Sequence, residues 1–304
     1  MMESKMEQEK KRVAGVSVFA ALFLTGFKLV VGLITGSLGL LSEALHSGLD
    51  LVAAVITWFS VRISDRPPDE NHHYGHGKIE NFSALVETFL LLITCAWIIY
   101  EAMRRLISGN TEIEVNIFSY IVVITSIVVD ILRSRALYRV ARKYKSQALE
   151  ADALHFSTDI YSSAVVLLGL ILANFKFYFA DSVAALAVAL IVLGVSWRLG
   201  KRATDVLLDR SPKPLVANVE SLLKGAKDIL RYHDLRIRTS GAENFIEVTI
   251  HVQPVLTLEE AHEISHRVEK QIIESIPRSF VHVHIEPDEH QTELDINNIV
   301  NSES

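Results

Sequence analysis

Six long apolar stretches dominate the first two thirds of this 304-residue chain and restrict the folds open to it. A helix needs about 20 apolar residues to cross the hydrocarbon core of a bilayer, because each residue adds about 1.5 Å of rise. Half of all residues are hydrophobic, and the mean hydropathy is +0.28. We therefore predict an integral, multi-pass membrane protein whose transmembrane helices occupy residues 13–35, 38–62, 79–106, 116–140, 149–173 and 178–200.

The polar segments divide the chain into four regions. Residues 1–12 form a charged N-terminal segment without a small-residue cleavage site, so the first apolar stretch is expected to be a retained span and not a signal peptide. The membrane domain is predicted over 13–208 and a soluble domain over 209–290, followed by a polar, disordered tail at 291–304.

The soluble region alternates between helical and strand patterns. Helices are predicted at 214–230 and 257–275, the second opened by the capping box Thr257-x-x-Glu260. Strands are predicted at 233–239, 245–253 and 280–286, the first two joined by a Ser240-Gly241 turn. This α-β-β-α-β order predicts a small α+β domain of the ferredoxin-like or metallochaperone-like kind.

Positive charges predict the orientation in the membrane. Lys and Arg residues crowd the N-terminus, the connection between the fourth and fifth spans, and the end of the sixth span. The positive-inside rule places all of these in the cytoplasm, at what we expect to be a prokaryotic inner membrane, with lipid around the spans. The net charge of −6 gives no sign of a nucleic-acid partner, and the single Cys95 excludes an intrachain disulfide and a cysteine-based zinc cluster.

Two copies of a His-x-x-x-Asp pattern lie inside apolar spans. His46 with Asp50 and His155 with Asp159 each share one helix face, because residues i and i+4 are neighbours there. From the helix ends, His46 and Asp50 lie roughly 12 and 18 Å deep, and the other pair roughly 9 and 15 Å deep from the opposite side. The two pairs therefore overlap near the midplane. Together they would form a four-ligand N2O2 site that suits a tetrahedral divalent metal such as Zn²⁺.

Histidines also cluster outside the spans. Asp69, His72 and His76 in the 69–78 loop form a possible second metal site, with a solvated capping loop as the alternative. His262-Glu263-x-x-His266 matches a zinc-protease pattern, yet a domain of this size has no room for the cleft of such an enzyme. Metal binding by the soluble domain is expected all the same, since it holds His233, His251, His262, His282, His284 and Glu286, with His282 and His284 on one strand face.

Three stretches together resemble the cation diffusion facilitator family: Gly36–His46, Asn71–Lys78 and Glu150–His155. The resemblance covers roughly residues 10–290 and implies export of Zn²⁺ by proton antiport from a homodimer. It implies a transport site at His46, Asp50, His155 and Asp159, and a loop site at Asp69, His72 and His76. It also implies a cytoplasmic binuclear site at His233, His262, His284 and Glu286, and a salt bridge between Lys78 and Asp209.

The chain departs from the family pattern at one position. Thr249 stands where relatives with the cytoplasmic site carry a strand histidine, and His251, two residues on, is predicted to substitute as a ligand. Zn²⁺ is thus expected both as substrate and as a structural or regulatory ion. Three alternatives stay open: export of Fe²⁺, Mn²⁺, Co²⁺ or Cd²⁺, a membrane zinc protease, and a metal sensor that does not transport.

Overall fold

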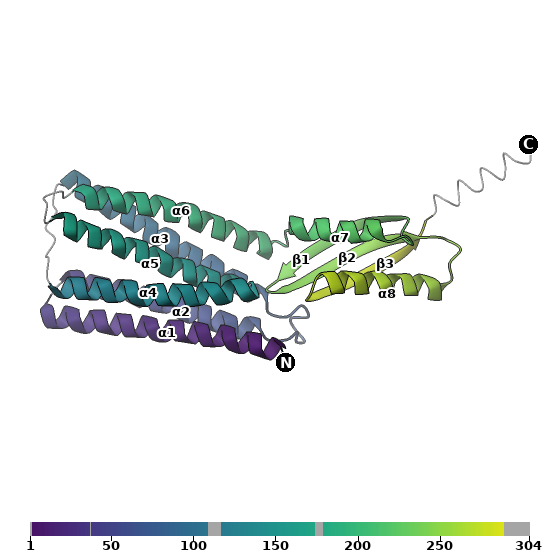
Figure 1. The fold of residues 1–304 in the computed structure, drawn as a ribbon, viewed down its shortest axis with the longest axis horizontal. Coiled ribbons are helices and arrows are strands. Elements are labelled where there is room, and N and C mark those ends of the chain that lie inside the picture. The colour runs from purple at the N-terminus through teal and green to yellow at the C-terminus, as the bar shows by residue number, and fades with distance from the viewer. Residues whose placement is uncertain (1, 37, 109–116, 174–178, 289–304) are drawn as a thin grey trace, which may run out of the picture. The chain divides into compact units, whose positions relative to one another are not determined.

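The computed structural model describes residues 2–36, 38–108, 117–173 and 179–288, which divide into two compact units after Leu207. The described part of the first unit consists of six long helices arranged side by side (Figure 1). Their bounds are α1 (Met2–Thr35), α2 (Leu38–Ser64), α3 (Lys78–Ser108), α4 (Ile117–Tyr144), α5 (Gln147–Ala173) and α6 (Phe179–Leu207).

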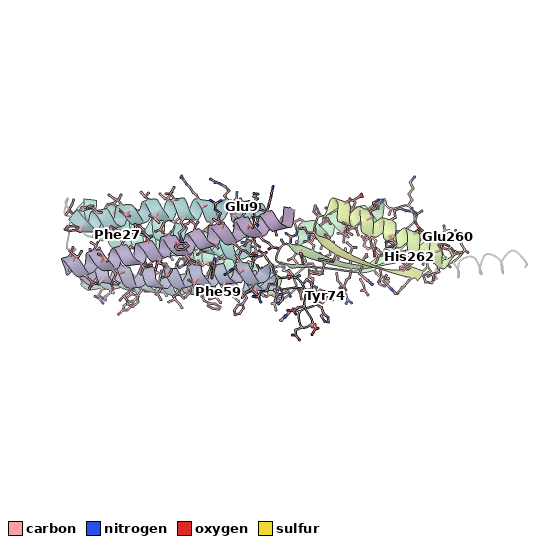
Figure 2. All side chains as sticks on the ribbon, turned by 90° about the horizontal axis from the view of Figure 1, so that it is seen from below. Glu9, Phe27, Phe59, Tyr74, Glu260 and His262 are labelled. Carbon is pink, nitrogen blue, oxygen red and sulfur yellow. The ribbon has the colours of Figure 1, made fainter. Side chains whose placement is uncertain are left out.

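Three of these helices are long and apolar enough to cross a membrane by length and composition, among the described residues. They are Lys5–Thr35, Glu43–Ser64 and Lys78–Arg104. Spans four to six remain predictions. Their helices run past the predicted ends, α4 to Tyr144 and α6 to Leu207, because the charged turns that follow the apolar stretch continue the helix. Phe59 points outward from α2, as expected of a side chain that faces lipid (Figure 2).

The N-terminal segment does not stay separate from the bundle. α1 begins at Met2, so the charged residues before position 13 are its first turns. The buried Lys10 ammonium explains this extension, since it lies 2.6 Å from an Asp65 carboxylate oxygen and 2.7 Å from one of Glu80. Ser146 at the start of α5 donates to the same Glu80 carboxylate. We call this end of the bundle, defined by Lys10, Asp65, Glu80 and Ser146, the basal end.

Small residues let the helices approach closely in the basal half. The most extensive pairings are α1 with α2, α3 with α6, and α4 with α5. Alanines occupy much of the core there, which is usual where membrane helices pack without bulky side chains between them. A methyl group added at Gly200 of α6 would come within 2.7 Å of the Thr88 side chain on α3, so this crossing requires glycine. The basal half is therefore tightly closed.

The second unit has the predicted α-β-β-α-β order. Its elements are α7 (Lys213–Gly225), β1 (Arg231–Ser240), β2 (Glu243–Val252), α8 (Leu258–Ser275) and β3 (Ser279–Pro287). The sheet order is β1-β2-β3, with β1 antiparallel and β3 parallel to β2. The capping box forms, since the Thr257 hydroxyl accepts from the Glu260 N–H and the Glu260 carboxylate accepts from the Thr257 N–H.

One predicted boundary in this unit is wrong. The helix expected over 214–230 ends at Gly225, because the chain turns there to join the sheet. The Leu230 N–H donates to the His251 carbonyl of β2 at 2.9 Å. In a continuing helix it would donate instead to the carbonyl four residues earlier. The tail predicted as disordered lies, from residue 289 onward, outside the described residues.

The two helices of the second unit cover one face of its sheet. Val219 and Leu223 of α7 and Ile264, Val268 and Ile272 of α8 pack against the β2 side chains Ile246, Val248, Ile250 and Val252. Successive strand residues point to opposite faces. The alternate positions of β2, among them Thr249 and His251, therefore belong to the face without helices, where the register pairs them with His284 and Glu286 of β3.

Candidate metal sites

The two His-x-x-x-Asp pairs meet in the interior of the bundle. His46 and Asp50 lie on α2, and His155 and Asp159 lie on α5. The His155 Nε2 atom is 3.0 Å from an Asp50 carboxylate oxygen and 3.9 Å from one of Asp159. The His46 Nε2 atom is 3.8 Å from the other Asp159 oxygen. His46, Asp50 and Asp159 each have one ligand atom within 4.8 Å of the ligand atoms of the other two, as a shared ion requires.

The four side chains form two layers. Antiparallel α2 and α5 place Asp50 beside His155 toward the basal end, where their side chains are 12% and 5% exposed. His46 and Asp159 form the layer farther from that end, and are 39% and 15% exposed. Below the inner layer lies the tightly packed basal half. The site is therefore closed toward the basal end and more open in the opposite direction.

Unused ligand atoms fit a metal at this position. The buried Nδ1 atom of His155 and the buried Oδ2 atom of Asp159 have no hydrogen-bond partner among the described residues. A buried polar atom without a partner is costly, and a bound cation would satisfy the carboxylate oxygen. Two neutral imidazoles and two carboxylates would also balance the charge of one divalent cation.

Buried ionisable residues surround this site, and the sequence patterns assign no role to them. Glu87 and Asp130 were visible in the sequence as charges within predicted spans. Asp152 carried a weaker signal, because it precedes His155 by three residues, which places it on the same helix face one turn nearer the basal end. Arg133 was visible only as one of several basic residues near the end of the fourth span. All four side chains are buried.

The loop between α2 and α3 brings its three predicted ligands together. The Asp69 carboxylate lies 3.1 Å from His72 Nδ1 and 3.3 Å from His76 Nε2, and the two imidazole centroids are 4.5 Å apart. The backbone N–H of His72, together with that of Asn71, lowers the pKa of the Asp69 carboxyl. The carboxylate is thus held ionised, which is the form that binds a metal. Tyr74 marks this loop in Figure 2.

The helix-free face of the second unit gathers part of its predicted ligand set. His233, His251 and Glu286 form a group of potential ligands, with His233 Nδ1 3.0 Å from His251 Nε2. His251 Nε2 is 3.7 Å from the Glu286 carboxylate, and His284 Nε2 is 3.6 Å from its other oxygen. Thr249 separates His233 from His284 in the register, and His251 occupies the neighbouring position expected of a substitute.

His262 does not join this group within one chain. It lies on α8 (Figure 2). Its exposed ring contacts His266, at a centroid distance of 4.6 Å. The part of His262 in a binuclear site with His233, His284 and Glu286 stays a prediction, as does the salt bridge between Lys78 and Asp209. In the first unit, Lys78 Nζ donates to the Leu207 carbonyl at 3.4 Å.

Comparisons with known proteins give the family. The model described as a cation efflux transmembrane domain matches residues 14–208, and the model described as a cation efflux protein, cytoplasmic domain, matches residues 212–288. An uncharacterised transporter of Methanocaldococcus jannaschii is 32% identical over 273 residues, which cover 89% of this chain and 96% of the relative.

Two further relatives have more specific names. The manganese efflux system protein MneS of Bacillus subtilis is 27% identical over 93% of this chain and 98% of its own length. The cation-efflux pump FieF of Shigella boydii is 29% identical over 93% of this chain and 95% of its own length. These are transporters and not hydrolases, so the zinc-protease reading of His262, Glu263 and His266 is excluded.

The architecture agrees with these matches: a helical membrane domain with ligands in its interior precedes a small sheet domain with helices on one face. Both models match in the order in which the two units occur along the chain. The chain belongs to the cation diffusion facilitator family of membrane transporters, which carry out divalent cation efflux.

Proposed function

We propose that the protein exports Zn²⁺ from the cytoplasm in exchange for protons. The observation that carries this proposal is the interior group of two imidazoles and two carboxylates on α2 and α5. Zn²⁺ accepts four N and O ligands in a tetrahedral arrangement, whereas Mn²⁺ favours sites made of oxygen donors. Two nitrogen donors among four ligands therefore support Zn²⁺ over the manganese named for one relative.

Proton exchange follows from the same four groups. A neutral imidazole binds a metal, and a protonated one cannot. Without metal, a protonated His155 is stabilised by Asp50 at 3.0 Å, and a protonated His46 by Asp159 at 3.8 Å. Two imidazolium groups balance the charge of the two carboxylates, and so does one bound Zn²⁺ ion with both imidazoles neutral. The site can therefore hold either two protons or one Zn²⁺ ion with little change in net charge.

The remaining predictions belong to the same proposal. The basal end faces the cytoplasm, with both termini on that side, and the protein acts as a homodimer in the plasma membrane. Asp69, His72 and His76 bind a second metal in the loop. In the cytoplasmic domain, metal is bound by His233, His251 and Glu286, which form one group, together with His262 and His284. Lys78 and Asp209 form a structural salt bridge.

Transport in reconstituted vesicles tests the central proposal. Purified protein is placed in vesicles with a proton gradient, and uptake of zinc, manganese, iron, cobalt and cadmium is compared. We expect the proton gradient to drive zinc against its own gradient and zinc to compete best. Zinc flux that ignores an imposed pH gradient would overturn the antiport. Manganese flux that exceeds zinc flux under competition would overturn the metal assignment.

Replacing one imidazole should change the metal preference. His46→Asp adds a hard oxygen ligand and a negative charge to the more exposed layer of the site. We expect the ratio of zinc to cadmium or manganese transport to fall by about tenfold, equivalent to roughly 1.4 kcal/mol of binding preference. Competitive uptake measures this ratio, with Ser47→Ala on the same helix as control. An unchanged ratio would remove His46 from the ligand set.

Metal should stabilise the cytoplasmic domain through simple linkage. A ligand at 100 times its Kd adds about 2.7 kcal/mol, and each kcal/mol shifts the Tm of so small a domain by roughly 4–8 °C. Zinc at that level should therefore raise the Tm of a fragment spanning 211–290 by roughly 10–20 °C. His251→Ala with Glu286→Ala should erase the increment, and His266→Ala should retain it. Equal increments in both variants would contradict the assigned ligands.

A further inference from the structure

A second buried polar layer lies between the metal site and the basal end. Four helices each contribute one member: Ser17 on α1, Glu87 on α3, Arg133 on α4 and Asp152 on α5. Glu87 and Asp152 are 0% exposed. None of these residues is among the proposed metal ligands. Their burial requires an explanation, because an ionised side chain away from water is strongly destabilising unless another charge or hydrogen bond compensates it.

Two members of this layer compensate each other. Arg133 Nε donates to the Ser17 hydroxyl at 2.7 Å, and that hydroxyl donates to an Asp152 carboxylate oxygen at 2.9 Å. The guanidinium carbon also lies 3.2 Å from the centroid of the Phe156 ring, a favourable cation–π contact. Arg133 and Asp152 thus form an ion pair bridged by a hydroxyl.

Glu87 has no cation of its own. Its Oε1 atom accepts from the Thr57 hydroxyl on α2, and its Oε2 atom is buried without a hydrogen-bond partner among the described residues. Ser83, one turn earlier on α3, adds only another uncharged hydroxyl. Among the described residues, no salt bridge reaches Glu87, unlike Glu80 on the same helix, which has Lys10.

The helices packed against α3 do not supply the missing positive charge. Asp152 on α5 acts on Glu87 as a second negative group, and Arg133 on α4 acts on it as a positive group without a salt bridge to it among the described residues. On α6 the contact is made by Gly200 against Thr88, which carries no charge. The cations at that end of α6 are exposed: Arg198, Lys201 and Arg202.

The charges near Glu87 then indicate the protonation state of its carboxyl group. Arg133 is one positive charge facing several buried carboxyl groups, among them those of Asp152, Asp130 and Glu87. Asp152 has the bridged ion pair, whereas Glu87 accepts from a hydroxyl and has one oxygen without a partner among the described residues. A neutral carboxylic acid needs no counter-ion, and its O–H is a donor that a carboxylate lacks.

We propose that Glu87 is a proton-binding residue separate from the metal ligands, protonated while the basal half of the bundle is closed and ionised when that half opens to water. Opening would break the Glu87 O–H bond, leave a carboxylate and transfer the proton to water on the basal side. Closing would reverse this transfer. The basal half would therefore open more readily as pH rises on that side. The opening step rests on the proposed export of Zn²⁺, for which the metal site must open toward the basal end; the protonation of the closed state does not.

Infrared spectroscopy tests the protonation without any transport. The full-length protein in lipid at neutral pH should show the carbonyl stretch of a protonated carboxylic acid, and Glu87→Gln should remove that intensity. Glu80→Gln is the matched control, because Glu80 is an equally buried glutamate of the same helix that is paired with Lys10. A spectrum that is unchanged by Glu87→Gln would overturn the proposal.

A second variant keeps this test independent of the fold of Glu87→Gln. Thr57→Val removes the hydroxyl that donates to the Oε1 atom of Glu87 and leaves the carboxyl in place. A protonated Glu87 then loses a hydrogen bond to its carbonyl oxygen, so the band should move to higher frequency. A band that stays in place in Thr57→Val would show that another acid carries the proton, and would overturn the assignment.

Accessibility of the basal half tests the opening step. Ser60→Cys places a buried thiol on α2 near Thr57, in a Cys95→Ala background that removes the native thiol. With Glu87 present, alkylation by a water-soluble reagent should rise with pH by up to about tenfold per unit beyond the rise seen with Glu87→Gln, as expected for one linked proton. Equal pH slopes would overturn the opening step. Failure of zinc transport in vesicles would affect neither result, so the two proposals fail separately.

Discussion

Removal of either membrane carboxylate is expected to abolish metal transport. Asp50→Ala and Asp159→Ala each delete a charged ligand from a four-ligand site and leave an imidazole of the other helix without its partner. Even outer-shell partners of a metal site are worth about 10- to 100-fold in metal affinity, so loss of a ligand should lower transport by at least about 100-fold. Initial rates of zinc uptake into vesicles measure the effect.

The control for these variants is a carboxylate of the same bundle that lies away from the site. Glu101→Gln on α3 changes a half-buried residue whose partner is Arg104, and should transport like the unchanged protein. Gel filtration and melting show whether each variant remains folded. A folded Asp50→Ala or Asp159→Ala protein with near-normal uptake would show that zinc passes elsewhere.

Replacement of both membrane histidines should remove the competition between protons and metal. A protonated imidazole does not bind metal, so the fraction of sites able to bind zinc decreases as pH falls and the imidazoles take up protons. The affinity of the site for zinc should therefore fall as pH falls. With two histidines the fall approaches about 100-fold per pH unit once both are protonated, because each proton contributes about tenfold.

The double variant His46→Asn with His155→Asn isolates this effect. An aspartate side chain in water has a pKa near 3.9, so zinc binding that depends on carboxylates without imidazoles should vary little above about pH 5.5. Zinc binding at a series of pH values measures both slopes, and a vesicle assay should show reduced proton release on zinc entry. Identical slopes for the double variant and the unchanged protein would place the exchanged protons on other residues.

The sequence alone determined the features that depend on neighbouring residues. Apolar length predicted the six helices, and i,i+4 spacing put each histidine beside its aspartate, since both follow from helix geometry. Period-two alternation and the Ser240-Gly241 turn predicted the strands of the second unit, and the capping signal at Thr257 located the start of α8. The antiparallel directions of α2 and α5 followed from the number of spans between them.

Only the tertiary structure decided how residues far apart in the sequence meet. The β1–β2 register, with its irregularity between His233 and Arg236, puts His233 against His251. The packing of α8 on the other face of the sheet leaves His262 outside the group of His233, His251 and Glu286, which spacing along the chain does not reveal. Long-range contacts of this kind depend on the register of packed elements, and a local pattern is compatible with several registers.

The same reason applies inside the membrane. In the sequence, Glu87 is a charge within an apolar span without a visible partner, and Arg133 is one of the positive charges toward the connection between the fourth and fifth spans. Helix packing joins Arg133 to Asp152 through Ser17 and leaves Glu87 with the hydroxyl of Thr57, residues drawn from five different helices. Whether a buried charge is compensated is a property of the assembled interior, where the low dielectric makes each missing partner costly.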